Sequence, residues 1–209
     1  MDWFGGALDD HDVLRSLYPA AEERAWRKDI GRLDEMARAL IAASPMLLLA
    51  TTAADGSCDA SPRGGQPGFV TVLDERHLAI PDATGNRRLD SLTNILDSGH
   101  AGLLFMIPGR TTTLRVNGQA CITADPDCLA QLSAVGKAPV TAIVVRVQEV
   151  YAHCPKAFVR SRLWQPDSWP DQQLLPSSAE VTLAHLRDPE LSLEEIRRRE
   201  RDSLTNRLA

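Results

Sequence analysis

The chain has 209 residues, of which 44% are hydrophobic and 24% charged, a balance typical of a globular protein rather than a disordered one. Its formal net charge of -5 offers no basic stripe for a polyanion, so we expect no nucleic acid partner. The longest apolar run, at residues 46–50, is far shorter than the roughly 20 residues that cross a bilayer, so we expect no membrane span. The acidic N-terminus lacks the apolar stretch of a secretory signal, which favours a cytoplasmic protein.

The cysteines and histidines do not follow the spacing of a metal site. The four cysteines form no CxxC pair and the five histidines show no i,i+4 pairing, so we predict no metal and ordinary reduced thiols. His153 and Cys154 are adjacent, but neighbours on a strand point to opposite faces, which disfavours a nucleophile pair. GxSxG, Walker A and GxGxxG motifs are all lacking, so the sequence names no catalytic residue.

Residues 1–43 are predicted to form an N-terminal helical segment. Helix-favouring residues are frequent from His11 onward, and Pro19 divides the segment in two. The apolar residues at helical spacing are Leu33, Met36, Ala37, Leu40 and Ile41. Ser44 and Pro45 end the helix before the period changes.

Residues 44–170 are predicted to form a small barrel. Short extended segments such as MLLLATT, HLAIP, TLRVNGQACIT and VTAIVVRVQEVYAH are separated by turn formers. They follow one another with hairpin spacing rather than regular βαβ alternation. We therefore expect a mainly β fold, a six-stranded barrel with helical additions.

Helices are predicted in and after this barrel. Residues 86–97 switch to helical spacing between two strands, and the predicted apolar stripe consists of Leu89, Leu92, Ile95 and Leu96. Asp125 is expected to cap a short helix that runs to Ala134. Residues 171–209 are predicted to form a polar loop followed by a solvated, highly charged helix at 191–208.

The most informative motif is GNRRLDSLTNI, at residues 85–95. It places Arg87 and Arg88 at a predicted helix start, where free backbone N–H groups favour an anion. Guanidinium groups bind phosphate bidentately, which makes this a candidate phosphate site. The alternative is a solvated helix start with two surface charges.

A second candidate anion ligand lies upstream, in SPRGG. Here Arg63 stands beside Gly64 and Gly65, which allow the backbone to approach a ligand closely. The alternative is a surface arginine in a glycine-rich loop.

These motifs together resemble a known family. The segments SPRGGQPGF, LAIPD, GNRRLDSLTNI, LLFMIPG and TLRVNGQA are similar to the pyridoxamine 5′-phosphate oxidase superfamily, and more narrowly to its bacterial FMN-binding branch. The resemblance covers residues 44–169. It implies an FMN-binding split β-barrel, here flanked by N-terminal and C-terminal helices, with FMN as the cofactor.

The resemblance also implies roles for particular residues. In the superfamily an arginine on a barrel strand and a basic pair before the next helix grip the FMN phosphate, and the matching positions are Arg63, Arg87 and Arg88. Thr113 stands where a longer family glutamine reaches the edge of the isoalloxazine ring. Three more positions fall where family members line the phosphate and the ring: Ser61, Asp82 and Asn86.

A homodimer with the flavin at the subunit interface is a further implication. The run HCPKAFVRSRLWQP looks like the family segment that enters a helix after the last long strand. Its candidate contacts to the partner's flavin are Lys156, Arg160, Ser161 and Trp164. Alternatively, its aromatic residues simply pack a surface helix onto the barrel.

The implied function is an FMN-dependent oxidoreductase that passes a hydride or electrons between a reduced nicotinamide or small organic substrate and the flavin. The substrate is not specified, and the RLxP ending of the true oxidase is lacking, which argues against vitamin B6 oxidation. Two alternatives stay open. One is a non-catalytic flavin-binding or storage module, and the other is a barrel that uses F420 or haem.

Overall fold

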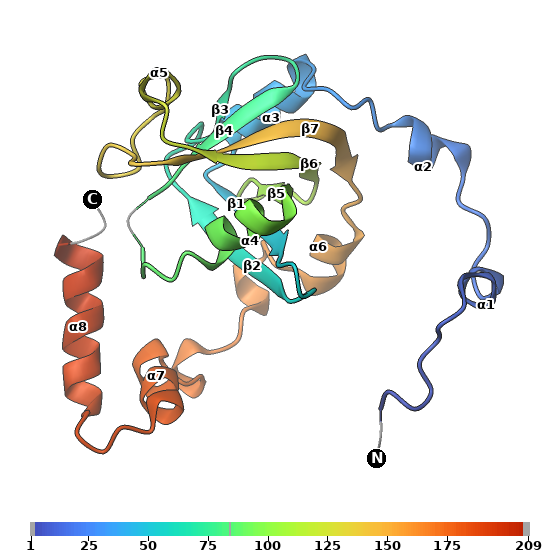
Figure 1. Ribbon diagram of the computed structural model, residues 1–209. Coiled ribbons are helices and arrows are strands. Elements are labelled where there is room, and N and C mark those ends of the chain that lie inside the picture. Colours follow the sequence, from blue (N-terminus) through green and yellow to red (C-terminus); the bar gives the residue numbers. More distant parts are fainter. Residues whose placement is uncertain (1–2, 84, 207–209) are drawn as a thin grey trace.

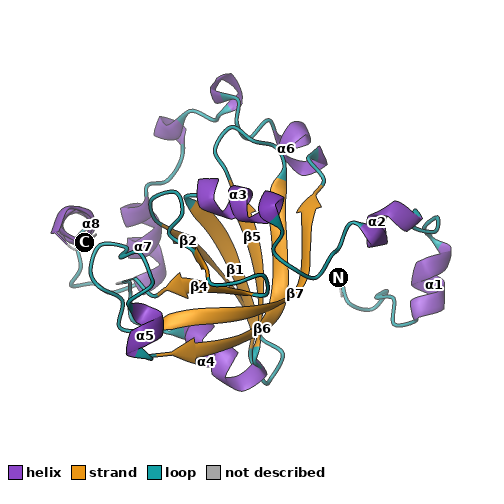
Figure 2. Cartoon of the chain, turned by 90° about the horizontal axis from the view of Figure 1, so that it is seen from above, coloured by secondary structure: helices purple, strands orange, loops and turns teal. Residues whose placement is uncertain are grey.

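The computed structural model describes residues 3–83 and 85–206 of the chain. Within these residues, seven strands form one antiparallel sheet in the order β2-β1-β5-β6-β7-β4-β3. The strands are β1 (Met46–Thr52), β2 (Cys58–Gly64), β3 (Thr71–Val72), β4 (His77–Pro81), β5 (His100–Met106), β6 (Thr113–Thr123) and β7 (Ala142–His153). The curved sheet and its helical additions confirm the predicted split-barrel class (Figures 1 and 2). The prediction of six strands was wrong by one, because the two-residue β3 pairs with β4 as a separate edge strand.

Alternating hydrophobicity explains how the sheet acquires its buried face. In β1 the side chains of Leu47, Leu49 and Thr51 are buried and the intervening residues are exposed, as expected for a strand covered on one side. The pairing of β6 with β7 shifts register between Asn117 and Gly118. Glycine is required there, since a Cβ at Gly118 would collide with the backbone carbonyl of Arg146.

Two helices pack on the barrel. In α3 (Glu35–Ala43), the side chain of Asp34 accepts a hydrogen bond from the backbone N–H of Ala37, and Ala37 and Ile41 join the core. The second helix, α4 (Asp90–Ser98), connects β4 to β5 and contacts β1, β2 and β6. Through these contacts α4 lies beside the strand that carries Arg63.

The start and the buried stripe of α4 differ from the prediction. The helix begins at Asp90 rather than at residue 86, because Arg87 and Leu89 both adopt a left-handed φ of 62°, which an α-helix cannot contain. Leu89 is 55% exposed and Leu96 73% exposed. Besides Ile95, the buried face of α4 carries two polar residues, Ser91 and Asn94.

The remaining helices lie outside the barrel. An N-terminal arm carries α1 (His11–Ser16) and α2 (Glu23–Arg27), neither of which buries a residue, and it extends away from the barrel on the side opposite α7 and α8 in both views (Figures 1 and 2). The others are α5 (Pro126–Leu129), α6 (Lys156–Ser161), α7 (Ser178–Leu186) and α8 (Leu193–Asn206). The helix predicted at 191–208 corresponds to α8, and its last two residues lie outside the described part of the chain. None of the helices in the described ranges is long and apolar enough to cross a membrane.

Candidate anion-binding site

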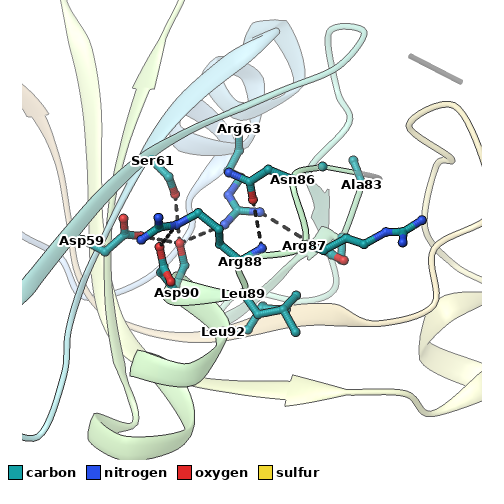
Figure 3. A pocket seen from close by; sticks show the side chains of 13 residues that line it. Asp59, Ser61, Arg63, Ala83, Asn86, Arg87, Arg88, Leu89, Asp90 and Leu92 are labelled. Atoms are coloured by element: carbon teal, nitrogen blue, oxygen red, sulfur yellow. Dashed lines mark hydrogen bonds and ion pairs between the residues drawn. The ribbon is translucent and has the colours of Figure 1, made fainter. Parts of the chain in front are cut away.

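A pocket of about 410 Å³ lies between β2, the segment after β4 and the first turn of α4 (Figure 3). Its lining residues are Asp59, Ser61, Arg63, Asp82, Ala83, Gly85, Asn86, Arg87, Arg88, Leu89, Asp90, Ser91 and Leu92. Of these, three carry a guanidinium and three a carboxylate, so the cationic groups of the pocket already have anionic neighbours. The pocket collects the sequence-predicted positions Ser61, Arg63, Asp82, Asn86, Arg87 and Arg88.

Arg63 is the most enclosed cation of the pocket. Its side chain projects from β2, opposite Leu47 on β1, and is 24% exposed. One terminal nitrogen donates to the hydroxyl of Ser91 at 2.9 Å, and the other lies 3.6 Å from the carboxylate of Asp82. The buried Nε has no hydrogen-bond partner among the described residues. A buried N–H without an acceptor is costly, so this guanidinium has spare capacity for an anion.

Ser91 links Arg63 to a second acid. The hydroxyl of this buried residue lies 2.5 Å from a carboxylate oxygen of Asp59, to which it donates, and 3.0 Å from the hydroxyl of Ser61. Asp59, Ser61 and Arg63 alternate along β2 and therefore project to the same side of the sheet. Ser91 lies in the first turn of α4, and its hydroxyl is within hydrogen-bond distance of all three side chains.

The two adjacent arginines point in different directions. The Nε of Arg88 donates to Asp90 at 2.7 Å, and its backbone N–H donates to the side chain of Asn86 at 3.0 Å. Arg87 extends away from Arg63 and Arg88 at the rim of the pocket (Figure 3). The left-handed backbone at Arg87 and Leu89 turns the loop at these points. Arg88 lines the pocket with its side chain 72% exposed and paired with Asp90.

Two side chains of the pocket, Asp82 and Arg88, have shifted pKa values. Burial raises the pKa of Asp82 above its ordinary value, and the neighbouring Arg63 only partly opposes this effect. The hydrogen bond to Asp90, together with the charge of that carboxylate, raises the pKa of Arg88, which stays protonated. The surroundings of Asp82 therefore disfavour its ionised form.

Comparison with known proteins identifies the family. The family model for pyridoxamine 5′-phosphate oxidase matches residues 33–154, which is more than half of the chain. The chain belongs to this family. A search of curated proteins found no significant match.

Several solved structures are similar to part of this chain. A candidate pyridoxamine 5′-phosphate oxidase from Lactobacillus delbrueckii is 26% identical, with 59% of this chain and 98% of that chain covered and a TM-score of 0.45. HupZ from Group A Streptococcus is 16% identical, with coverage of 57% and 92% and a TM-score of 0.44. An FAD-binding protein from Mycobacterium smegmatis is 14% identical, with coverage of 59% and 97% and a TM-score of 0.39.

The other residues predicted to bind the cofactor lie apart from the pocket. Thr113 is buried at the start of β6, where it pairs with His153 on β7. The remaining predicted residues lie in or just after α6: Lys156, Arg160, Ser161 and Trp164. Trp164 stacks on Phe158 with 5.8 Å between ring centroids, and its indole N–H donates to the carbonyl of Arg110 at 2.8 Å. Within one chain, α6 therefore contributes nothing to the pocket lining that the described residues form.

Three lining residues with polar side chains were not predicted from the sequence: Asp59, Asp90 and Ser91. The alternation of polar residues at 59, 61 and 63 was a usable signal for Asp59, because period-two spacing places them on one face. Ser91 was hidden by the apolar spacing predicted for its helix. The described residues contain no group of three or more His, Cys, Asp or Glu side chains that could hold a metal ion.

Proposed function

We propose that this protein is a flavoprotein that binds FMN, with the FMN phosphate in the pocket around Arg63 and Arg88. The observation that carries the proposal is the Arg63 guanidinium, which is three-quarters enclosed and retains a buried Nε–H without an acceptor. A phosphate ester carries nearly two negative charges at neutral pH and three acceptor oxygens, which suits two guanidinium groups. Membership of the pyridoxamine 5′-phosphate oxidase family supports the same ligand class.

We further propose an FMN-dependent oxidoreductase as the activity. When bound, FMN supplies hydride or electron transfer, and the substrate and its electron donor, a reduced nicotinamide or a small organic molecule, are set by the space above the ring. The chain's own residues hold and orient the cofactor. Arg63 and Arg88 would bind the phosphate, and Asn86 fixes the loop by accepting the backbone N–H of Arg88.

A homodimer with the flavin at the subunit interface is part of this proposal. Lys156 and Arg160 on α6 are exposed and do not line the pocket of their own chain, so they would contact a flavin only if it were held by another subunit. Ser161 and Trp164 lie at the end of the same helix and just beyond it. We also propose that this dimer is cytoplasmic.

One absorbance spectrum of the purified protein tests the ligand. Bound or added FMN should give the flavin bands, and the cofactor extracted from the protein should be identified by its own spectrum. A colourless protein that binds no added FMN would overturn the proposal, and a haem or F420 spectrum would replace FMN by that cofactor. Turnover of NADH or NADPH by the FMN complex supports an oxidoreductase, whereas binding without turnover of any donor indicates a flavin-storage module.

A further inference from the structure

The hydroxyl of Ser91 is fully used by its neighbours. A serine hydroxyl has one proton to donate and two lone pairs to accept. Its proton goes to Asp59, and one lone pair accepts from Arg63, so Ser61 donates to the remaining one. This assignment leaves the proton of Ser61 unavailable to a ligand, which means that Ser61 supports Arg63 through Ser91 rather than contacting the phosphate as a donor.

The geometry explains why a relay is needed. Asp59 and Arg63 lie four residues apart on one strand, and their α-carbons are therefore separated by about 13 Å. Ser91 enters from α4 between them and lies within 3.0 Å of both side chains. It joins a carboxylate to a guanidinium through one hydroxyl, and hydrogen bonds in such a chain strengthen one another.

The other contacts of Arg63 do not fix it in this way. Asp82 lies 3.6 Å away, beyond ordinary hydrogen-bond length, and Nε has no partner among the residues described. Without Ser91 the guanidinium would keep only the longer interaction with Asp82. That interaction would draw the guanidinium toward the Asp82 carboxylate rather than toward a bound phosphate.

We infer that Ser91, oriented by Asp59, is a positioning residue that holds the Arg63 guanidinium in the orientation in which it binds the phosphate. The inference rests on the proposed function, since it concerns the same pocket. Ser91 acts through Arg63 and makes no contact with the cofactor of its own. It should therefore contribute to phosphate binding and leave the flavin ring unaffected.

The test compares FMN with riboflavin, which lacks the phosphate. For Ser91→Ala we expect the ratio of FMN to riboflavin affinity to fall about tenfold, with riboflavin affinity unchanged. Ser98→Ala is the matched control, because Ser98 lies on the same helix and its hydroxyl also bonds within the fold, to the carbonyl of Asn94 at 2.8 Å. The control should leave the ratio unchanged.

A double-mutant cycle distinguishes positioning from direct contact. If Ser91 acts through Arg63, then Ser91→Ala should have no further effect on the ratio in an Arg63→Ala background. A further tenfold loss in that background would overturn the inference. Ser91→Cys, which is close in size but hydrogen-bonds weakly, serves as the second variant should Ser91→Ala fail to fold.

Failure of the inference is distinguishable from failure of the proposed function. A wild-type protein that binds neither FMN nor inorganic phosphate overturns both. A wild-type protein that binds FMN more tightly than riboflavin, with the same ratio in folded Ser91→Cys or Ser91→Ala, overturns only the role of Ser91.

Discussion

The guanidinium of Arg63 lies 3.6 Å from the carboxylate of Asp82, and both side chains are about three-quarters enclosed, at 24% and 26% exposure. Asp82 thus stands next to the group that the proposal assigns to the phosphate. Asp82 lines the pocket, as the family resemblance implies. Because two anions near one cation repel each other, Asp82 would compete with the phosphate for Arg63 under the proposal.

Asp82→Asn should therefore strengthen FMN binding. Removal of a partly exposed competing charge is expected to raise FMN affinity about two- to tenfold and to change the free energy of unfolding at neutral pH by less than about 1 kcal/mol. Fluorescence titration with FMN and urea unfolding measure the two quantities. Weaker FMN binding by Asp82→Asn would mean that the carboxylate contacts the cofactor directly.

The gain in FMN affinity expected for Asp82→Asn should depend on pH. Burial raises the pKa of Asp82, so the carboxyl group stays neutral to a higher pH than an ordinary aspartate and competes for Arg63 only above that range. The affinity of the Asn variant relative to wild type should rise as the pH rises through the raised pKa of Asp82. The titration of the free FMN phosphate is the same in both measurements and cancels in this ratio.

The same shift has a consequence for stability without ligand. A raised pKa in the folded state means that Asp82 contributes most to the free energy of unfolding at low pH, and that this contribution is lost as the pH rises through the raised pKa. The free energy of unfolding of Asp82→Asn relative to wild type should therefore rise as the pH rises through the raised pKa, because only wild type loses this contribution. A pH dependence identical to that of wild type would contradict the assignment.

Arg88→Ala should weaken FMN binding. Loss of one charge-assisted hydrogen bond to phosphate is worth on the order of 1.5–3 kcal/mol, which corresponds to about 10- to 100-fold in affinity. Arg87→Ala is the matched control, because Arg87 is adjacent but points away from Arg63 (Figure 3). Equal losses in the two variants would place the phosphate nearer the rim than the proposal does.

Mixing two defective variants tests the proposed dimer. In a dimer with shared sites, Arg63→Ala damages the pocket of its own chain, whereas Lys156→Ala with Arg160→Ala damages the site of the partner. Mixed dimers of the two variants should regain one intact site in two, measured as FMN bound per chain after unfolding and refolding together. A mixture that binds no more FMN than the separate variants would argue against a site built from two chains.

The strands could be predicted from the sequence. The geometry of the site could be predicted only in part. A short apolar run closed by turn formers identified β1, and alternation identified β6. The start of α4 could not be predicted, because Arg87 and Leu89 adopt a left-handed backbone conformation. Residues other than glycine and asparagine seldom adopt this conformation, so arginine and leucine gave no sign of it. Of the predicted apolar stripe of α4, Leu92 and Ile95 do pack on the core, whereas Leu89 and Leu96 are exposed. The buried face instead includes Asn94, whose side chain donates to Thr51 on β1 at 3.1 Å.

Some residues of the pocket could be predicted from the sequence and others could not. Arg63 and Arg88 were found because guanidinium groups next to glycines and a helix start are a recognisable pattern. Ser91 became visible only through tertiary contacts, because its role depends on the approach of α4 to β2. Side chains that position a ligand-binding group leave a weaker mark on a sequence than the group itself.

The affinities of FMN and riboflavin for wild type and for Arg63→Ala test the central claim most directly. The account predicts that wild type binds FMN at least tenfold more tightly than riboflavin, and that Arg63→Ala removes most of this preference while retaining riboflavin affinity. An Arg63→Ala protein that is folded and keeps the full preference for FMN would contradict the account.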